Sequence, residues 1–302
     1  MFFKKLFAAV SAAAIMLTTA VTANADTVSA RDFTQYRSNY ATANLTKNER
    51  ELYNRLDNVA MRLLTDSSIN AEYNSKYEVY HTDYVTYSDL SLSLDEARNV
   101  AIWFKNNNPQ YYFLAEMNLS LKSSSSQGTT EKIAIKVYDF AADGAARAII
   151  TESLFDVVDE WVKSVTDDEV TTYQKELSIN NLICDELDYD LNSAYNQSVF
   201  SAVMNKSTVC AGYAAAFSML CNAADIDCLN VSSSSHGWNI VKLDNGKWYV
   251  VDSTWNDSTG IRTYIFNHGE NSVLKLDENN SHVYDFYSTK WKPAVSSYSV
   301  TS

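Results

Sequence analysis

Glycine and basic residues are scarce in this chain of 302 residues. Loops that cradle phosphate groups rely on closely spaced glycines, and the chain has only 7 glycines, so a nucleotide-binding loop is not expected. Lysine and arginine together number 24 against 37 acidic residues, which gives a net charge of −13. Neutralising phosphates requires clustered basic side chains, so this balance excludes a nucleic acid as partner.

Cysteine is also rare, with residues only at positions 184, 210, 221 and 228. Four unevenly spaced cysteines are too few for a small domain held together by disulfides. Cys221 and Cys228 alone are close, and their gap is wider than the usual two to four residues between zinc ligands, so no metal is predicted. A disulfide between Cys221 and Cys228 stays open, and it would leave Cys210 unpaired.

Long apolar runs are absent except at the start of the chain. There Lys4 and Lys5 precede an apolar run from Leu6 to about Val21, and an Ala-x-Ala pattern ends at Ala25. This pattern predicts a signal peptide over residues 1–25, because the run is shorter than the roughly 20 strongly apolar residues of a membrane span. The mature protein is therefore expected to be secreted or at the extracellular surface, without a membrane span. The sequence specifies no oligomeric state.

Aromatic residues are abundant, with 20 tyrosines, 12 phenylalanines and 6 tryptophans, which excludes a disordered polypeptide. Residues 26–44 are polar and without a period, and are predicted to be a flexible lead-in. Residues 45–170 are predicted to be mainly helical. Capping boxes mark two helix starts, at Thr46 with Glu49 and at Ser93 with Glu96.

After residue 120 the spacing of the apolar residues changes along the chain, from the period of a helix to the alternation of a strand and back. "SLKSSSSQGTTEK" is expected to be a polar loop before the strand "IAIKVYDF", and helices are predicted from about 141 to 165 and from about 171 to 187. A third helix should run from Val209 to Asp225, and "CLNVS", "GWNIVKL", "KWYVVDSTW" and "RTYIFN" are predicted strands. Helices followed by consecutive strands predict an α+β fold with an antiparallel sheet. Residues 291–302 would be a C-terminal tail.

Three residues in this region suggest chemistry. Cys210 stands at a predicted helix N-terminus, where the helix dipole favours a thiolate. His236 follows a polar serine loop, and Asp252 ends an apolar strand, where a carboxylate is costly to bury unless it is paired. Each residue also has an ordinary structural interpretation when taken alone.

The hairpin between the two strands decides whether His236 and Asp252 can meet. A two-residue loop at Asn245 and Gly246 would point their side chains to opposite faces. A three-residue loop over Asp244–Gly246, with Gly246 in the left-handed conformation, places Trp238 opposite Asp252 and His236 diagonally on the same face. We predict the three-residue register.

These segments resemble the transglutaminase-like superfamily, especially bacterial secreted members related to transglutaminase/protease-like cytokinesis proteins. The resemblance covers about residues 171–268 and is carried by "VCAGYAAAFSMLC", "HGWNIVKL", "GKWYVVDSTWND" and "YIFN". "FKNNNPQYYFL" is also similar to a segment in the N-terminal halves of such bacterial proteins. The chain departs from the family pattern at Gly237, where alanine is usual, and at Ser253, where proline often follows the aspartate.

The resemblance implies a papain-like transglutaminase core over residues 171–290. It also implies acyl transfer from a peptide or glutamine carbonyl through a thioester, without a cofactor. Cys210 would be the nucleophile, His236 the general base and acid, and Asp252 the group that orients the imidazole. Hydrolysis is slightly favoured over amine crosslinking, and the substrate would be a protein or peptide, at the cell surface or elsewhere outside the cell.

Two questions stay open at this point. The alternative function is a catalytically inactive module of the same fold that binds or scaffolds at the cell surface. The side-chain donor of an oxyanion hole is also unassigned beyond an upstream Gln, Asn, Trp or Tyr. His282 is expected to have a surface role rather than a role in the site.

Overall fold

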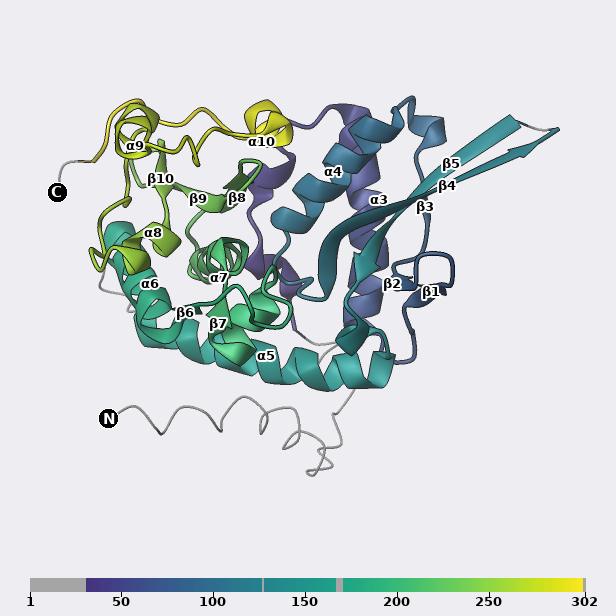
Figure 1. Ribbon diagram of the computed structural model, residues 1–302, viewed down its shortest axis with the longest axis horizontal. Coiled ribbons are helices and arrows are strands. Elements are labelled where there is room, and N and C mark those ends of the chain that lie inside the picture. The colour runs from purple at the N-terminus through teal and green to yellow at the C-terminus, as the bar shows by residue number, and fades with distance from the viewer. Residues whose placement is uncertain (1–30, 127, 167–170, 301–302) are drawn as a thin grey trace.

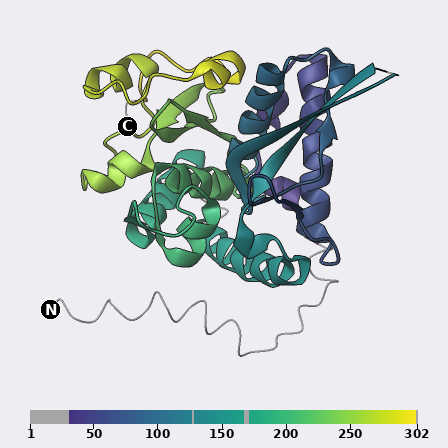
Figure 2. The same ribbon diagram turned by 45° about the vertical axis from the view of Figure 1, so that its right-hand side comes forward.

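The computed structural model describes residues 31–126, 128–166 and 171–300, so the predicted signal peptide lies outside the described residues. These residues form helices and antiparallel sheets in two halves that share one continuous apolar core. In Figures 1 and 2 the N-terminal half, coloured purple to blue, lies beside the green and yellow C-terminal half. No helix in the described part of the chain is long and apolar enough to cross a membrane.

Two helices of the N-terminal half begin at the predicted capping boxes. In both, the hydroxyl of the first residue accepts from the backbone of the glutamate, whose carboxylate accepts in return, which confirms both predicted starts. The helices pack on each other and beside a five-stranded sheet. Their bounds are α3 (Lys47–Thr65) and α4 (Leu94–Asn106), and the strands are β1 (Glu72–Asn74), β2 (Val79–His81), β3 (Val85–Thr86), β4 (Leu114–Ser125) and β5 (Gly128–Val137).

The expected polar loop "SLKSSSSQGTTEK" is wrong. It forms the outer part of a long hairpin in which β4 and β5 pair as far as Ser125 opposite Gly128, and Figure 1 shows this hairpin projecting from the body. Both faces of its outer part are exposed, so the sequence carries no alternation of apolar and polar residues. The ladder of backbone hydrogen bonds holds the hairpin where side-chain burial does not.

The expected flexible lead-in is also wrong over the residues that the structure describes. Residues 31–44 form two short 3-10 helices, η1 (Phe33–Tyr36) and η2 (Asn39–Thr42). Phe33 and Tyr36 are buried against the ring of Phe155, and the indole of Trp103 donates to a carbonyl of this segment. A few large aromatic anchors fix the segment, and single anchors leave no periodic signal in the sequence.

The C-terminal half begins with two helices, α5 (Gly144–Val165) and α6 (Thr172–Glu186), which match the two predicted ones closely. A short parallel pair of strands, β6 (Asp188–Tyr189) and β7 (Ser207–Thr208), flanks the helical turn η5 (Ser201–Asn205). Helix α7 (Cys210–Ala223) then packs on the antiparallel sheet β10–β9–β8. The remaining elements are β8 (Cys228–Ser232), β9 (Gly237–Lys242), β10 (Trp248–Val251), α8 (Ser253–Ser258), α9 (Glu270–Leu276), α10 (Phe286–Trp291) and η3 and η4 (Ser88–Leu90 and Asp139–Ala141).

The hairpin register between β9 and β10 is the predicted one. Trp248 pairs with Lys242 and Val251 with Asn239, and Gly246 has φ +76°. The three-residue loop is therefore confirmed. The fourth predicted strand, "RTYIFN", is wrong, because those residues form turns and only His268, just beyond them, makes a bridge to Val250.

Gly212 lets the first turn of α7 approach β7 closely. A Cβ at this position would lie 1.9 Å from Oγ1 of Thr208. That hydroxyl is fully buried, donates to the carbonyl of Asn196 (2.8 Å) and shares a hydrogen bond with Ser201 (2.6 Å). The first turn of α7, which begins with Cys210, can therefore occupy this position only because residue 212 has no Cβ.

We expect Gly212→Ala to destabilise the protein by about 1–3 kcal/mol, because overpacking outweighs the helix propensity gained. Urea unfolding gives the measurement. Gly237→Ala is the matched control: its Cβ would lie 3.7 Å from Ala211, an ordinary contact, so its stability should stay within about 0.5 kcal/mol of wild type. Equal stability of the two variants would contradict this account of the α7 start.

Candidate active site

Cys210 is the first residue of α7. The residue before it, Val209, is extended and provides no side-chain cap for the N–H groups of Cys210 and Ala211, whereas the N–H of Gly212 donates to the Val209 carbonyl (2.9 Å). The thiol is partly exposed and lines a cavity of about 450 Å³. The other three cysteines are buried, and all four thiols are free. Burial, and then the neighbouring Cys228, raise the pKa of the Cys221 thiol.

His236 lies just before β9, in a turn closed by Ser233. The hydroxyl of Ser233 accepts a hydrogen bond from the backbone N–H of His236 (3.1 Å). The backbone N–H of Ser233 donates to the carbonyl of His236 (2.9 Å). The imidazole stacks on Trp238 with ring centroids 5.9 Å apart. Its Nε2 is 2.6 Å from Oδ2 of Asp252, so Nδ1 is the ring nitrogen left to interact with Cys210, which is near enough to help raise the pKa of the imidazole.

The charge on His236 is set by competing effects. Burial alone lowers the pKa of its imidazole, but the hydrogen bond and charge of Asp252, followed by those of Cys210, outweigh burial and raise the pKa to about 10. The ring is therefore protonated at neutral pH.

Asp252 is almost fully buried, with 1% of its surface exposed. It caps α8: Oδ1 accepts the N–H of Trp255 (3.1 Å), while Oδ2 accepts from His236 and from His282. Burial raises the pKa of this carboxyl, but the charge and hydrogen bond of His236 and the contacts with His282 lower it to about 2. The cost of burying the carboxylate is offset by three donors.

His282 contradicts the expected surface role. It is 3% exposed, and its Nε2 donates to Oδ2 of Asp252 at 3.0 Å. The prediction failed because "NNSHVYDFY" is polar and has no period, so the sequence gives no sign that this loop folds over the site. The sequence did offer one indication: a buried Asp252 needs hydrogen-bond donors, and a histidine elsewhere in the chain can supply one.

One donor atom from each of His236, Asp252 and His282 lies within 4.8 Å of the others, a spacing that can hold a metal ion. Here the same atoms bond to each other, with both Nε2–H groups donating to one carboxylate oxygen. A metal would have to displace both protons. We therefore assign the cluster as a hydrogen-bond network, and the absence of a metal or other cofactor stays a prediction.

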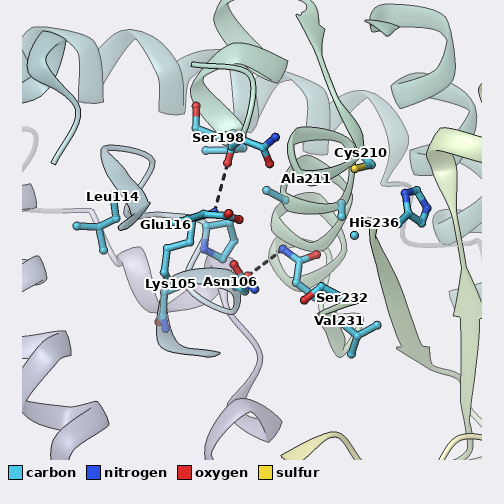
Figure 3. Close-up of a pocket in the computed structure, with 18 of the residues that line it drawn as sticks. Lys105, Asn106, Leu114, Glu116, Ser198, Cys210, Ala211, Val231, Ser232 and His236 are labelled. Carbon is cyan, nitrogen blue, oxygen red and sulfur yellow. Dashed lines mark hydrogen bonds and ion pairs between the residues drawn. The ribbon is translucent and has the colours of Figure 1, made fainter. Parts of the chain in front are cut away.

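The cavity beside Cys210 has walls from both halves of the chain. The segment after α4, within "FKNNNPQYYFL", forms one wall, and the α7 start, the serine loop and β8 form the other. In Figure 3, Cys210 and His236 lie on one side while Lys105 and Glu116, whose charged groups are 3.5 Å apart, lie on the opposite side. The N-terminal half therefore shapes the cleft rather than only packing behind it.

Buried asparagines join these two walls. Oδ1 of Asn107 accepts the Asn230 backbone N–H (2.9 Å), and the Asn230 amide donates to the carbonyl of Asn106 (2.8 Å). Asn239 continues the chain by donating to Asn230 (2.7 Å) and to the carbonyl of Ala214 in α7 (3.0 Å). The end of α4 is thereby held in register with β8, β9 and α7.

Two upstream side chains are candidates for the unassigned oxyanion donor. Gln197 lines the same cavity as Cys210. Tyr189 lies near Cys210 and Asp252. Burial, followed by the charges of these two residues, raises the pKa of its hydroxyl. The backbone N–H of Cys210 is the third candidate, because it stands at a helix N-terminus.

Comparisons with known proteins find similarity to one family over part of the chain. Residues 159–253 match the family model described as the transglutaminase-like superfamily. Cys210, His236 and Asp252 all lie within the matched range, whereas His282 and the N-terminal wall of the cleft lie outside it.

Two curated relatives match this chain over part of their length. The kyphoscoliosis peptidase of Homo sapiens is 27% identical over 136 residues, covering 36% of this chain and 20% of the relative. The Mus musculus kyphoscoliosis peptidase is 29% identical over 111 residues, covering 28% and 17%. The chain therefore spans about a fifth of the length of these relatives.

Two solved structures are also similar. A structure described as a TGase aligns with a TM-score of 0.31 and 12% identity, covering 45% of this chain and 43% of that one. A candidate cysteine protease from Cytophaga hutchinsonii aligns with a TM-score of 0.26 and 15% identity, covering 46% and 62%.

The His236–Asp252 pair predicts a pH-dependent stability. Because the folded pKa of His236 is raised to about 10, the pair stabilises the fold fully below the unfolded histidine value of about 6.5. That stabilisation is lost as the pH rises from about 6.5 to about 10. The difference in unfolding free energy between wild type and Asp252→Asn should therefore shrink over this range.

Urea unfolding at pH 6.5, 8 and 10 measures this difference. Other groups that titrate in the range are common to both proteins, so they cancel in the comparison. A difference that stayed constant with pH would show that His236 is not held as a cation by Asp252.

Proposed function

We propose that this protein is a thiol enzyme in which Cys210 attacks a peptide or glutamine carbonyl and carries the acyl group as a thioester. The observation that supports this most strongly is that Cys210 and His236 line one open cavity while His236 is hydrogen-bonded to the buried Asp252. A nucleophile, a base and a group that orients the base are the parts that this chemistry needs.

The roles follow from the geometry. The Cys210 thiolate forms the bond to the carbonyl carbon, and the protonated His236 gives its proton to the departing amine or ammonia. His236, now neutral, takes a proton from the incoming water or amine as that molecule attacks the thioester. The acyl product leaves, and the thiolate and imidazolium are restored. Asp252 fixes the Nε2–H tautomer and stabilises the imidazolium throughout.

The acceptor decides between hydrolysis and crosslinking. Both share the acylation step and differ only in whether water or an amine reaches the thioester. We favour hydrolysis by a small margin, since the curated relatives that match the core are named peptidases. The inactive binding module is the outcome expected if Cys210 is unreactive.

We further propose that residues 1–25 direct export and are removed, so that the substrate is a protein or peptide outside the cell. Mass spectrometry of the protein recovered from the medium of its own host would find a chain that begins at Asp26. Intact, cell-associated protein with an N-terminal Met1 would contradict this.

Cys210 should be the reactive thiol. In the mature protein we expect iodoacetamide at pH 6 to alkylate Cys210 at least tenfold faster than a free thiol, whose pKa near 8.5 leaves it protonated. Cys210→Ala should abolish this labelling. Cys184→Ala, which removes a buried thiol, is the matched control and should leave it unchanged.

The same proteins should then be given a glutamine-containing protein and a labelled primary amine, with peptide cleavage, ammonia release and amine incorporation measured together. Turnover by wild type and Cys184→Ala, but not by Cys210→Ala, is the expected result. Equal labelling of all three proteins in the alkylation experiment would remove the proposal of a thiol enzyme, and incorporation exceeding hydrolysis would reverse the preferred acceptor.

A further inference from the structure

We propose that His282 is a positioning residue for the reaction, which holds Asp252 in the orientation that His236 requires. The inference rests on the proposed function of the Cys210 site. His282 lies beyond the segment that matches the family and comes from the loop between α9 and α10. It reaches the site because the C-terminal segment, residues 277–291, packs against the serine loop, residues 232–235, and against Trp238 of β9.

The contact with Asp252 is direct. Nε2 of His282 is 3.0 Å from Oδ2, the same oxygen that Nε2 of His236 approaches at 2.6 Å. A carboxylate is only an acceptor, so both imidazoles must carry their proton on Nε2. With Oδ1 held by the N–H of Trp255 at 3.1 Å, the carboxylate has no freedom to rotate about its own axis.

His282 is itself held from the other side by Asp277. The carboxylate of Asp277 accepts the His282 backbone N–H at 2.6 Å, and Oδ2 lies 3.2 Å from Nδ1 of the ring. The second of these is a close approach without the geometry of a hydrogen bond. The series therefore runs Asp277, His282, Asp252, His236 and Cys210, from the interior to the cavity.

Aromatic rings fix the plane of the His282 imidazole. Its centroid lies 4.8 Å from that of Trp238, with the rings at 61°, 4.7 Å from that of Trp255, with the rings at 85°, and 5.2 Å from that of His236. The same C-terminal segment holds the loop that carries His236, because Asp285 accepts from the Ser232 hydroxyl at 2.8 Å. One segment therefore restrains both partners of the His236–Asp252 pair.

A second cavity, of about 290 Å³, is lined in part by His282. Its lining is mostly apolar and includes Leu274 and Val283, both about half exposed, so the cavity is reachable from solvent. Removing the imidazole would extend this cavity to Asp252. A small molecule of the same shape can then take the place of the missing ring.

The experiment compares His282→Phe, which keeps a ring without a donor, with His282→Gln, which keeps an N–H donor. We expect His282→Phe to lower kcat about 10- to 100-fold with KM unchanged, since a hydrogen bond to a charged group is lost. The rate of Cys210 alkylation at pH 6 should fall in parallel. His282→Gln should recover most of both.

The pH profile gives a further readout. Loss of the His282 donor raises the pKa of Asp252, so the acid limb of kcat/KM should move to higher pH in His282→Phe. The titratable groups that face Asp252 from the packed elements stay in place in this variant: His236, Cys210, Tyr189 and, behind the substituted ring, Asp277.

His282→Ala tests the same point by rescue. Added imidazole should restore the alkylation rate at least tenfold, whereas thiophene, a ring of similar size without an N–H donor, should not. Equal rescue by both would overturn the proposal, because it would show a packing role alone. A His282→Phe protein that keeps its wild-type melting temperature and alkylates within twofold of wild type would overturn it as well.

Alkylation separates this proposal from the proposed function. The iodoacetamide reaction requires the thiolate and the oriented imidazolium but no turnover of a substrate. If wild type turns over no peptide or amide while the His282 variants still change Cys210 alkylation as described, the enzymatic function fails and the positioning role of His282 stands.

Discussion

The site depends on one buried carboxylate oxygen. Oδ2 of Asp252 accepts from two imidazoles within an apolar sheet, and the other oxygen of the same group begins α8. A buried carboxylate without donors would be neutral or excluded from this position. Its three donors keep it charged, and its charge keeps His236 protonated beside Cys210. The strand β10, helix α8 and the C-terminal segment are thus tied to the chemistry at a single point.

The cleft is a product of both halves of the chain. The core supplies the Cys210 helix and the His236–Asp252 hairpin, while the segment after α4 supplies the facing wall. The side chains of Asn107, Asn230 and Asn239 set the distance between these walls with hydrogen bonds to backbone groups and to each other, which are directional and tolerate little displacement. One apolar core runs through both halves, so packing as well as hydrogen bonding holds the two walls of the cavity together.

The sequence predicted those parts of the fold that depend on residues close together in the chain. The capping boxes, the α7 start at Cys210 and the three-residue hairpin loop were all predicted because each depends on a few neighbouring residues. Long-range contacts were not predictable in this way. The anchoring of Phe33 and Tyr36 and the burial of His282 depend on partners far away in the chain. The projecting β4–β5 hairpin is held by pairing between neighbouring strands, but both faces of its outer part are exposed, so its sequence has no apolar alternation. Juxtaposition of Cys210, His236 and Asp252 required both the register argument and the family resemblance.

The protonation state of His236 tests the account most directly. Nitrogen-15 NMR of the imidazole in the mature protein, recorded from pH 5 to pH 11, reports the two ring nitrogens separately. The account predicts a ring that stays protonated at both nitrogens through neutral pH and titrates near pH 10, with the Nε2 proton retained after the transition. A ring that titrated near the unperturbed value of about 6.5, or kept its proton on Nδ1, would contradict it.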